Sequence, residues 1–189
     1  MTEPPTTSAA TPAFLSDGVL NLRAVRRADL AQLAEWRNSP DIRERTREWK
    51  PLNDDDQERW FARISGADRR DLMFVVETSD ARSAIGVVGL CYWDPINATA
   101  EISFYIGAAA ARGRGLAKRA LTLLVEWGLG TMRLERIWAE AYAFNEVSIA
   151  LLKDLGFKEE GRLRQHVHRQ GRRWDSVMLG LLREEWPAR

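Results

Sequence analysis

A short basic segment that contains glycines separates two differently patterned parts of this chain. Residues 107–115 include Arg112, Gly113, Arg114 and Gly115. Residues 100–106, just before the segment, alternate with the period of a strand, whereas apolar residues after it recur at helical spacing. Glycines accept positive φ, and the N–H groups at the start of a helix bind anions. The segment therefore predicts a strand–loop–helix unit with a nest for an anion such as a pyrophosphate.

The rest of the chain carries patterns for further strands and helices. Alternating or β-rich runs predict a strand at 19–25, then a meander at 72–77, 84–93 and 100–106, and later strands at 136–141, 162–168 and 174–182. Helical spacing predicts helices at 29–38, from 53 onward, at 116–127 and at 145–155. No linker or repeat divides these elements. We therefore predict one α/β domain over residues 18–189, preceded by a disordered tail at 1–17.

Composition excludes several classes of protein. The 28 Lys and Arg residues nearly balance the 27 Asp and Glu residues, so we expect no nucleic-acid partner. Because the single cysteine, Cys91, cannot form an intrachain disulfide, a reducing compartment is expected. No apolar run predicts a membrane span or a secretory signal, so cytoplasmic localisation is the default. The only two histidines, His166 and His168, have no evident third ligand, so no metal site is predicted.

Familiar nucleotide-binding loops do not explain the glycine segment. The dinucleotide fingerprint requires a third glycine where this chain has Lys118, and it follows a parallel rather than an antiparallel strand. The phosphate loop of nucleoside triphosphatases requires Gly-Lys-Ser/Thr, which is absent. An anion loop after an antiparallel meander thus needs another explanation.

Four motifs in a fixed order supply that explanation. They are Gly113-Arg114-Gly115-Leu116-Ala117, Asn145-Glu146-Val147-Ser148, Leu155-Gly156-Phe157 and Glu160-Gly161. In these motifs the chain resembles the GNAT acetyltransferase superfamily, in particular its RimJ/RimL-like branch, over about residues 19–186. One departure is Ala110, where the superfamily loop usually has Arg or Gln.

The resemblance implies a fold and a cofactor. The fold is a mixed, largely antiparallel sheet flanked by helices, with a splay between two central parallel strands that end near Ile106 and Ala141. Acetyl-CoA would lie in the splay as the acyl donor. Asn145 and Ser148 would face it, and the remaining cofactor contacts implied by the resemblance are Phe104, Tyr105, Ile106, Arg112, Gly113, Arg114, Gly115, Leu116 and Ala117.

Acetyl transfer to an amine requires a proton acceptor and a proton donor for the departing thiolate. Glu101 is the first candidate base, the alternative being a cross-strand ion pair, and Glu140 is the second. The superfamily often places a tyrosine acid where this chain has Leu152. The resemblance to the RimJ/RimL-like branch gives that role to Ser148, although a serine in a first helical turn also serves the backbone there. Tyr105 and Tyr142 are reserve acids.

Superfamily acceptors enter opposite the cofactor, against the first helices and the last hairpin. The candidate acceptor residues there are Trp36, Arg37, Trp93 and His166. Residues 162–173 hold five arginines and no acid, which predicts either a site for an acidic acceptor or a solvated hairpin paired with the acidic run at 54–58.

The sequence therefore predicts an acetyl-CoA-dependent N-acetyltransferase that works by direct attack in a ternary complex. Its expected acceptor is a protein N-terminal α-amine. One alternative is a small-molecule acceptor, namely an amino sugar, an aminoglycoside or a polyamine. Another is a non-catalytic acyl-CoA-binding domain, given Ala110 and the missing tyrosine. Because edge strands in such folds often pair, a homodimer is a further expectation.

Overall fold

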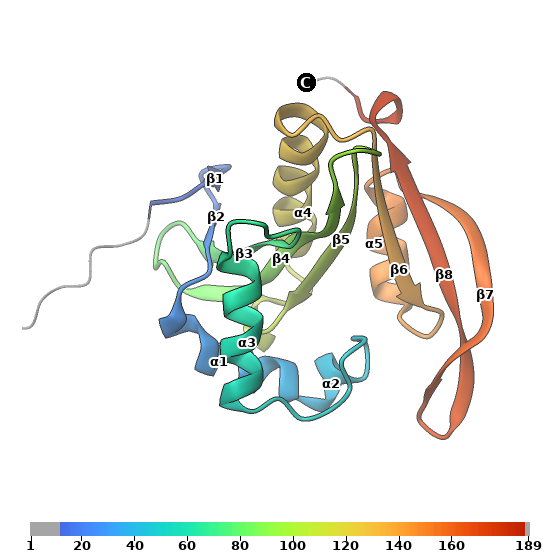
Figure 1. Ribbon diagram of the computed structural model, residues 1–189, viewed down its shortest axis with the longest axis horizontal. Coiled ribbons are helices and arrows are strands. Elements are labelled where there is room, and N and C mark those ends of the chain that lie inside the picture. The colour runs from blue at the N-terminus through green and yellow to red at the C-terminus, as the bar shows by residue number, and fades with distance from the viewer. Residues whose placement is uncertain (1–11, 188–189) are drawn as a thin grey trace, which may run out of the picture.

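Figure 1 shows the computed structural model of the protein, which describes residues 12–187. Within these residues the strands form one eight-stranded sheet in the order β1-β2-β3-β4-β5-β6-β8-β7. Every neighbouring pair is antiparallel except β5 and β6, which are parallel. The strands are β1 (Leu15–Ser16), β2 (Leu20–Ala24), β3 (Leu72–Thr78), β4 (Ala84–Asp94), β5 (Thr99–Ile106), β6 (Arg136–Tyr142), β7 (Lys158–Arg169) and β8 (Arg172–Leu182).

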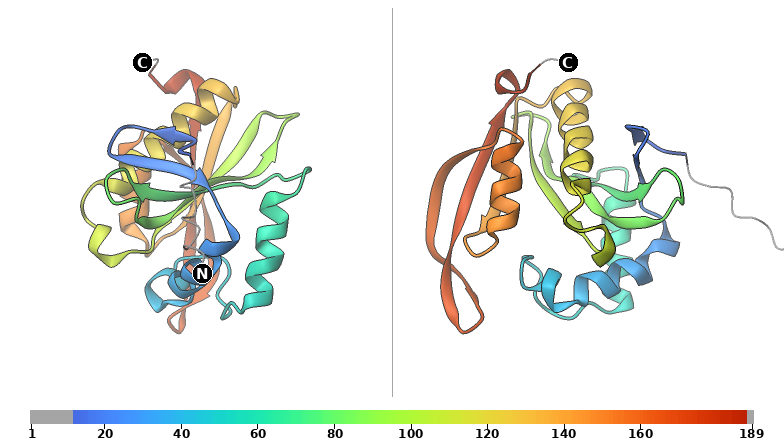
Figure 2. Two further views of the ribbon diagram at one scale, coloured as in Figure 1. Left: turned by 90° about the vertical axis from the view of Figure 1, so that its left-hand side faces the viewer. Right: turned by 180° about the vertical axis from the view of Figure 1, so that it is seen from behind.

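Helices cover both faces of the sheet. They are α1 (Leu30–Asn38), α2 (Pro40–Arg43), α3 (Asp54–Ser65), α4 (Leu116–Glu126) and α5 (Glu146–Asp154), with short turns η1 (Arg27–Asp29), η2 (Ala109–Ala111), η3 (Trp127–Thr131) and η4 (Arg183–Glu185). Figure 2 shows α4 and α5 on the face opposite to α3. No helix within residues 12–187 is both long enough and apolar enough to cross a bilayer.

The main core lies between α4 and the sheet. Leu121 and Leu124 of α4 are fully buried, and they belong to one cluster with Val88 of β4 and Ile137 of β6. Each such side chain contributes about 1.5–3 kcal/mol when it leaves water. The helical spacing seen in the sequence thus fixes α4 on the sheet directly after the glycine loop.

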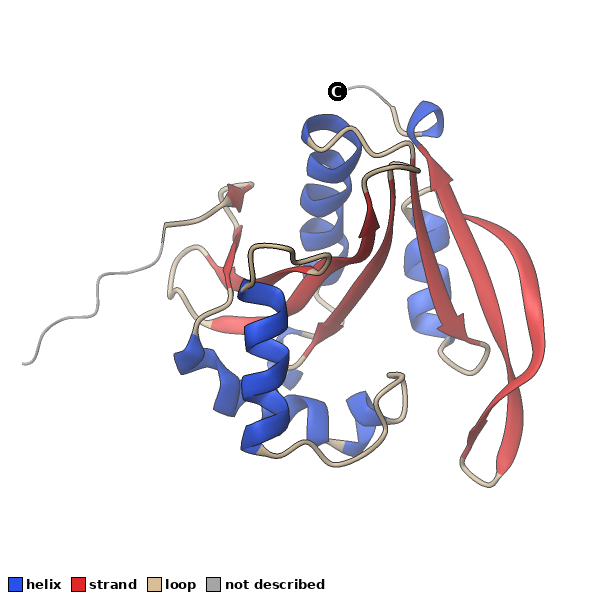
Figure 3. Ribbon diagram, in the orientation of Figure 1, coloured by secondary structure: helices blue, strands red, loops and turns tan. Residues whose placement is uncertain are grey.

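The structure confirms the predicted order of strands and helices (Figure 3) and adds two short elements. Leu15 and Ser16 pair with β2, so this part of the expected tail is a strand, while residues 1–11 of that tail lie outside the described residues. The short helix α2 follows Pro40, which suits the first turn of a helix. Asn53 starts α3 as predicted, in a capping box with Asp56.

The two central parallel strands separate as the resemblance implied. β5 and β6 pair only from Thr99–Arg136 to Glu101–Trp138. Beyond that point β5 continues to Ile106 on β4, and β6 continues to Tyr142 on β8. The edges of 102–106 and 139–142 that face each other are therefore not paired with one another, and a ligand can reach the backbone between them.

Candidate active site

A cavity of about 660 Å³ opens where β5 and β6 separate. Its lining comes from α1, α3 and the loop between α2 and α3 on one side, and from Asn145, Ser148 and Leu152 on the other. Five of the residues predicted from the sequence meet there: Arg37, Phe104 and Tyr105 with Asn145 and Ser148. Glu101 and Glu140 also line it, at the point where the strands part.

A single arginine joins the two candidate bases. Nη1 and Nη2 of Arg47 donate to Oε2 and Oε1 of Glu101 at 2.8 and 2.5 Å. The same Nη2 reaches Oε2 of Glu140 at 2.9 Å. Glu101 was predicted to be either the general base or a member of a cross-strand ion pair, and it does form an ion pair. The partner, however, comes from the loop between α2 and α3 rather than from a neighbouring strand, and Glu101 is only 5% exposed rather than solvated.

Burial and pairing act on these two carboxyl groups in opposite directions. Burial raises the pKa of Glu101 above its ordinary value, and the hydrogen bonds from Arg47 offset only part of that rise. Burial also raises the pKa of Glu140, but hydrogen bonds from Ser176 and Arg47 outweigh it, so the net shift is downward. Glu140 is therefore the group of this pair that holds its negative charge more firmly.

Asp71 and Cys91 lie on the same cavity wall. Asp71 accepts a hydrogen bond from the backbone N–H of Tyr92 and pairs with Arg63 at the rim. Burial, with a smaller effect from nearby carboxylates, raises the pKa of the Cys91 thiol to about 12. A thiol that stays protonated is a poor nucleophile, so the cavity does not activate Cys91 for attack.

The glycine loop has the geometry of an anion site. Gly113 and Gly115 have φ of 72° and 74°, in the left-handed region that favours glycine. A Cβ at either position would meet no atom within 4 Å, so the space beside the loop is open. Gly115 is the N-cap of the 11-residue helix α4, whose first N–H groups lack intrahelical partners. The loop from Arg112 to Ala117 therefore has the open space and the free helix N-terminus that the predicted pyrophosphate site requires.

The two arginines of this loop differ in what they contact. The guanidinium of Arg112 donates to the backbone oxygen of Ile106 at 3.0 Å and pairs with Asp41 at 3.2 Å. Its side chain thus binds the end of β5. Arg114 makes no hydrogen bond or ion pair of this kind within the described residues.

Asn145 and Ser148 are placed by the start of α5. Asn145 is the N-cap, but its side chain makes no capping hydrogen bond, and it faces the cavity instead. Ser148 also lines the cavity, and its hydroxyl has no hydrogen-bond partner among residues 12–187. Ser148 therefore does not use its hydroxyl for the first helical turn, which was the structural alternative to a role in the reaction.

Of the four candidate acceptor residues, only Arg37 is among the residues that line the cavity, and Trp36, Trp93 and His166 are not. Arg37 lines the cavity, with its guanidinium 5.9 Å from the centre of the Tyr105 ring and its Nε buried without a partner among the described residues. Trp36 instead lies over Gly107, where a Cβ would come within 2.0 Å of the ring. Trp93 packs against the core. Trp36 and Trp93 are thus not cavity walls, because their rings cover the backbone and the core.

The arginines of the β7–β8 hairpin do not pair with the acidic run at 54–58. In the described residues Arg162 pairs with Glu159, Arg172 stacks on Trp174, and Asp56 and Glu58 pair with Arg59 and Arg27. The predicted pairing between hairpin and acidic run is therefore wrong. The hairpin tip instead contacts the loop between α2 and α3, through Arg169 to the Thr46 carbonyl and Gln170 to Glu44.

Sequence reasoning missed Arg47, which organises the floor of the cavity. It lies in an Arg- and Glu-rich segment without periodicity, where nothing distinguishes it from Arg43 or Arg45. Its role depends on contacts across more than 50 residues, which local patterns do not reveal.

Comparison with known proteins gives the family. Residues 20–158 match the acetyltransferase (GNAT) domain family. The chain belongs to this family, as the motifs indicated, and it is an acyltransferase with acetyl-CoA as its donor. This finding does not support the alternative of a non-catalytic acyl-CoA-binding domain.

Several relatives are named as N-acetyltransferases. The uncharacterized N-acetyltransferase p20 of Bacillus licheniformis is 34% identical over 123 residues, which cover 65% of this chain and 67% of that protein. The putative ribosomal N-acetyltransferase YdaF of Bacillus subtilis is 33% identical over 104 residues, 55% of this chain and 56% of that protein. These matches span just over half to two thirds of the relatives' own lengths.

A longer match is to the spermidine N(1)-acetyltransferase of Vibrio cholerae, 27% identical over 88% of this chain and 95% of that protein. A crystal structure of spermidine N-acetyltransferase from Vibrio cholerae in complex with CoA and spermine is similar with a TM-score of 0.81 and 26% identity. The likeness covers 89% of this chain and 98% of that one. The neighbour binds CoA in the fold that this chain shares.

Proposed function

We propose that this N-acetyltransferase acts on a singly charged primary amine, in particular the α-amine of a protein N-terminus, by direct attack within a ternary complex. The observation that carries this proposal is the charge balance of the cavity. Five arginines and five carboxylates line it: Arg37, Arg45, Arg47, Arg59 and Arg63 against Glu48, Asp56, Asp71, Glu101 and Glu140. A wall of this kind attracts one ammonium group but gives little advantage to a polycation.

The floor of the cavity supports the same proposal. Glu101 and Glu140 carry two negative charges, and Arg47 neutralises one of them. One negative charge remains, which matches one ammonium group. An α-amine has a pKa of about 7.7–8.0, so a tenth or more of it is already neutral near pH 7, unlike a lysine-type amine with a pKa of about 10.4.

Specific residues then carry the proposed roles. The edge of β5 at Phe104, Tyr105 and Ile106 would pair with pantetheine, and the loop from Arg112 to Ala117 would hold the pyrophosphate. Ser148 would protonate the departing thiolate. Because both oxygens of Glu101 accept bonds from Arg47, we assign Glu101 to holding Arg47 rather than to removing a proton from the acceptor.

The exposed hairpin supports an acceptor with acidic groups beyond its amine. Arg164, Arg172 and Arg173 are exposed, and in the described residues none of them pairs with a carboxylate. Charge-assisted hydrogen bonds from such arginines suit carboxylates or phosphates. The strand β7 is also at the edge of the sheet, so we expect it to be a place where two copies of the chain can pair.

A polyamine acceptor is the second candidate. It is favoured by the similarity to the Vibrio spermidine N-acetyltransferase over 89% of this chain. A phosphate-bearing amino sugar would share an anionic group with an acidic protein N-terminus, but it has no peptide backbone.

A thiol-release assay with purified protein and acetyl-CoA separates these acceptors. The panel contains a tetrapeptide that begins with alanine followed by two acidic residues, its N-terminally blocked form, a tetrapeptide with two basic residues, spermidine, and glucosamine 6-phosphate. We expect the acidic peptide to give a kcat/KM at least about tenfold above spermidine, or about 1.4 kcal/mol, and the blocked peptide to be inactive. A preference for spermidine or for the sugar over the free peptide would contradict the proposed acceptor.

A further inference from the structure

A bulge in β7 aims one histidine across the neighbouring strand. Leu163 pairs with Ser176 and Val167 with Trp174, so residues 164–166 lie opposite the single residue Asp175 of β8. Within the bulge Gln165 has a φ of 51°, which a side-chain-bearing residue rarely adopts. Oδ1 of Asp175 holds this conformation by accepting the Gln165 N–H at 2.8 Å. Bulges beside functional sites commonly serve to redirect a side chain.

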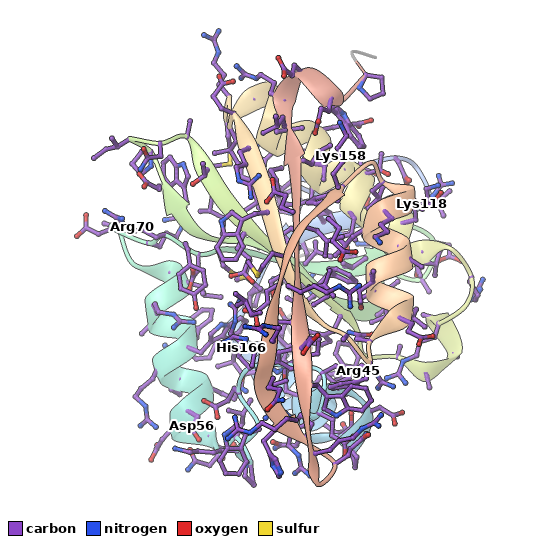
Figure 4. All side chains as sticks on the ribbon, turned by 90° about the vertical axis from the view of Figure 1, so that its right-hand side faces the viewer. Arg45, Asp56, Arg70, Lys118, Lys158 and His166 are labelled. Carbon is purple, nitrogen blue, oxygen red and sulfur yellow. The ribbon has the colours of Figure 1, made fainter. Side chains whose placement is uncertain are left out.

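The redirected side chain is His166. Its Nδ1 lies 2.8 Å from Oγ of Ser176 on β8 and 3.0 Å from Oε1 of Glu140 on β6. It therefore reaches over a whole strand to a carboxylate that lines the cavity. Figure 4 shows His166 near the place where β7 crosses β8, in the middle part of the hairpin. The other histidine, His168, makes no side-chain hydrogen bond or ion pair within residues 12–187.

These contacts fix the orientation of the imidazole. A carboxylate only accepts hydrogen bonds, so Nδ1 carries the proton that faces Glu140, and the lone pair of the neutral ring is on Nε2. Nε2 has no partner among the described residues, and the side chain is 45% exposed. A carboxylate behind Nδ1 and a free Nε2 is the arrangement of a histidine general base.

We infer that His166, oriented by Glu140, is the general base that takes a proton from the acceptor ammonium through one bridging water. The inference rests on the proposed function and deepens it. Both oxygens of Glu101 are committed to Arg47. His166 does not itself line the cavity, but it contacts the cavity-lining Glu140 through Nδ1, which is why the proton is assigned to it through a water.

The proton balance of the step is complete. The ammonium gives one proton to Nε2 of His166, and the ring becomes an imidazolium whose charge is compensated by Glu140. The neutral amine then forms its bond to the thioester carbon, and the carbon–sulfur bond breaks. The thiolate takes a proton from Ser148, which regains one from the attacking nitrogen. His166 returns its proton to solvent.

Several charged and polar groups lie around His166 and its partner Glu140. Glu140 faces the ring from β6, Ser176 and Asp175 belong to β8, and Arg47 reaches Glu140 from the loop between α2 and α3. The printed contacts of the ring are made through Nδ1, and within the described residues none of these groups bonds Nε2, on which the inference depends.

Two matched variants test the inference with the acidic tetrapeptide as acceptor. In His166→Gln we expect kcat/KM to fall about tenfold at pH 7, because only about a tenth of the α-amine is neutral there. The loss should shrink to less than about threefold at pH 9, where the amine needs no base. His168→Gln, two residues away on the same strand, should stay within about twofold of the wild type at both pH values.

The tautomer of the His166 imidazole can be measured directly, without relying on turnover. Because the chain contains two histidines, nitrogen-15 NMR of the wild type and of His168→Gln assigns His166. We expect His166 to be the Nδ1–H tautomer in the wild type. In Glu140→Gln we expect this tautomer to be no longer preferred. An Nε2–H tautomer, or a His166→Gln deficit that is equal at pH 7 and pH 9, would overturn the inference while leaving the acetyltransferase proposal intact. A wild type that acetylates no amine of the panel would overturn both.

Discussion

Replacing Arg47 with methionine is expected to lower the free energy of unfolding by about 2–3 kcal/mol at pH 8. The substitution leaves the 5%-exposed carboxylate of Glu101 without its counter-ion. Breaking a fully buried pair costs about 3–5 kcal/mol, and the loss here is smaller because the Arg47 side chain is 45% exposed and water can enter. Urea unfolding followed by circular dichroism measures the change.

The pH dependence of this loss has a definite sign. Burial already places the folded-state pKa of Glu101 above its ordinary value of 4.5, and removal of Arg47 raises it further. For an acid with a raised folded-state pKa, ionisation opposes folding, so the loss of stability is complete above that pKa and fades as the pH falls toward 4.5.

Arg45→Met is the matched control, because exposed Arg45 lines the same cavity but bonds the Asp41 carbonyl. We expect it to change stability by less than about 0.5 kcal/mol. Equal losses in the two variants, or a loss that grows toward acid pH, would contradict this account of the cavity floor.

Replacing Ser148 with alanine is expected to lower kcat by about tenfold to a hundredfold, or about 1.4–2.7 kcal/mol. A thiol of ordinary pKa, about 8.5, leaves poorly as an unprotonated thiolate near pH 7, and Ser148 is the hydroxyl at the start of α5 that faces the cavity. The deficit should shrink above about pH 8.5, where the thiolate is stable in water. Single-turnover kinetics at pH 7 and pH 9 measure it.

The control for this variant is the preceding residue. Val147 is 80% exposed and points away from the cavity, so Val147→Ala should keep kcat within about twofold. Acetyl-CoA affinity should be unchanged in Val147→Ala. A Ser148→Ala enzyme with wild-type kcat at pH 7 would remove Ser148 from the chemistry and return the role of proton donor to Tyr105 or Tyr142.

The fold and the cofactor half of the site were predictable because they follow from local patterns. The alternation in 100–106, the glycines at 113 and 115 and the apolar spacing of α4 each act over a few residues, and the structure has them as expected. The capping box of Asn53 and the positive φ of Gly156 are local in the same sense.

The acceptor half depends on contacts that no local pattern records. Arg47 meets Glu101 and Glu140 across 54 and 93 residues. The bulge that turns His166 toward Glu140 arises from the pairing of two strands. Its residues 164–166 interrupt the period of two, and none of these three is a glycine or a proline. Trp36 and Trp93 were predicted to contact the acceptor because of their size and position in the sequence. In the structure Trp36 covers the backbone at Gly107 and Trp93 packs against the core.

The central claim is that acetyl-CoA lies between β5 and β6 with its pyrophosphate on the glycine loop. Amide hydrogen exchange with and without saturating acetyl-CoA tests it most directly, because the expected contacts are with backbone N–H groups. We predict slower exchange in two segments, 102–106 and 112–117, with smaller changes at the start of α5. Unchanged exchange in both segments, or protection confined to the β7–β8 hairpin, would contradict the claim.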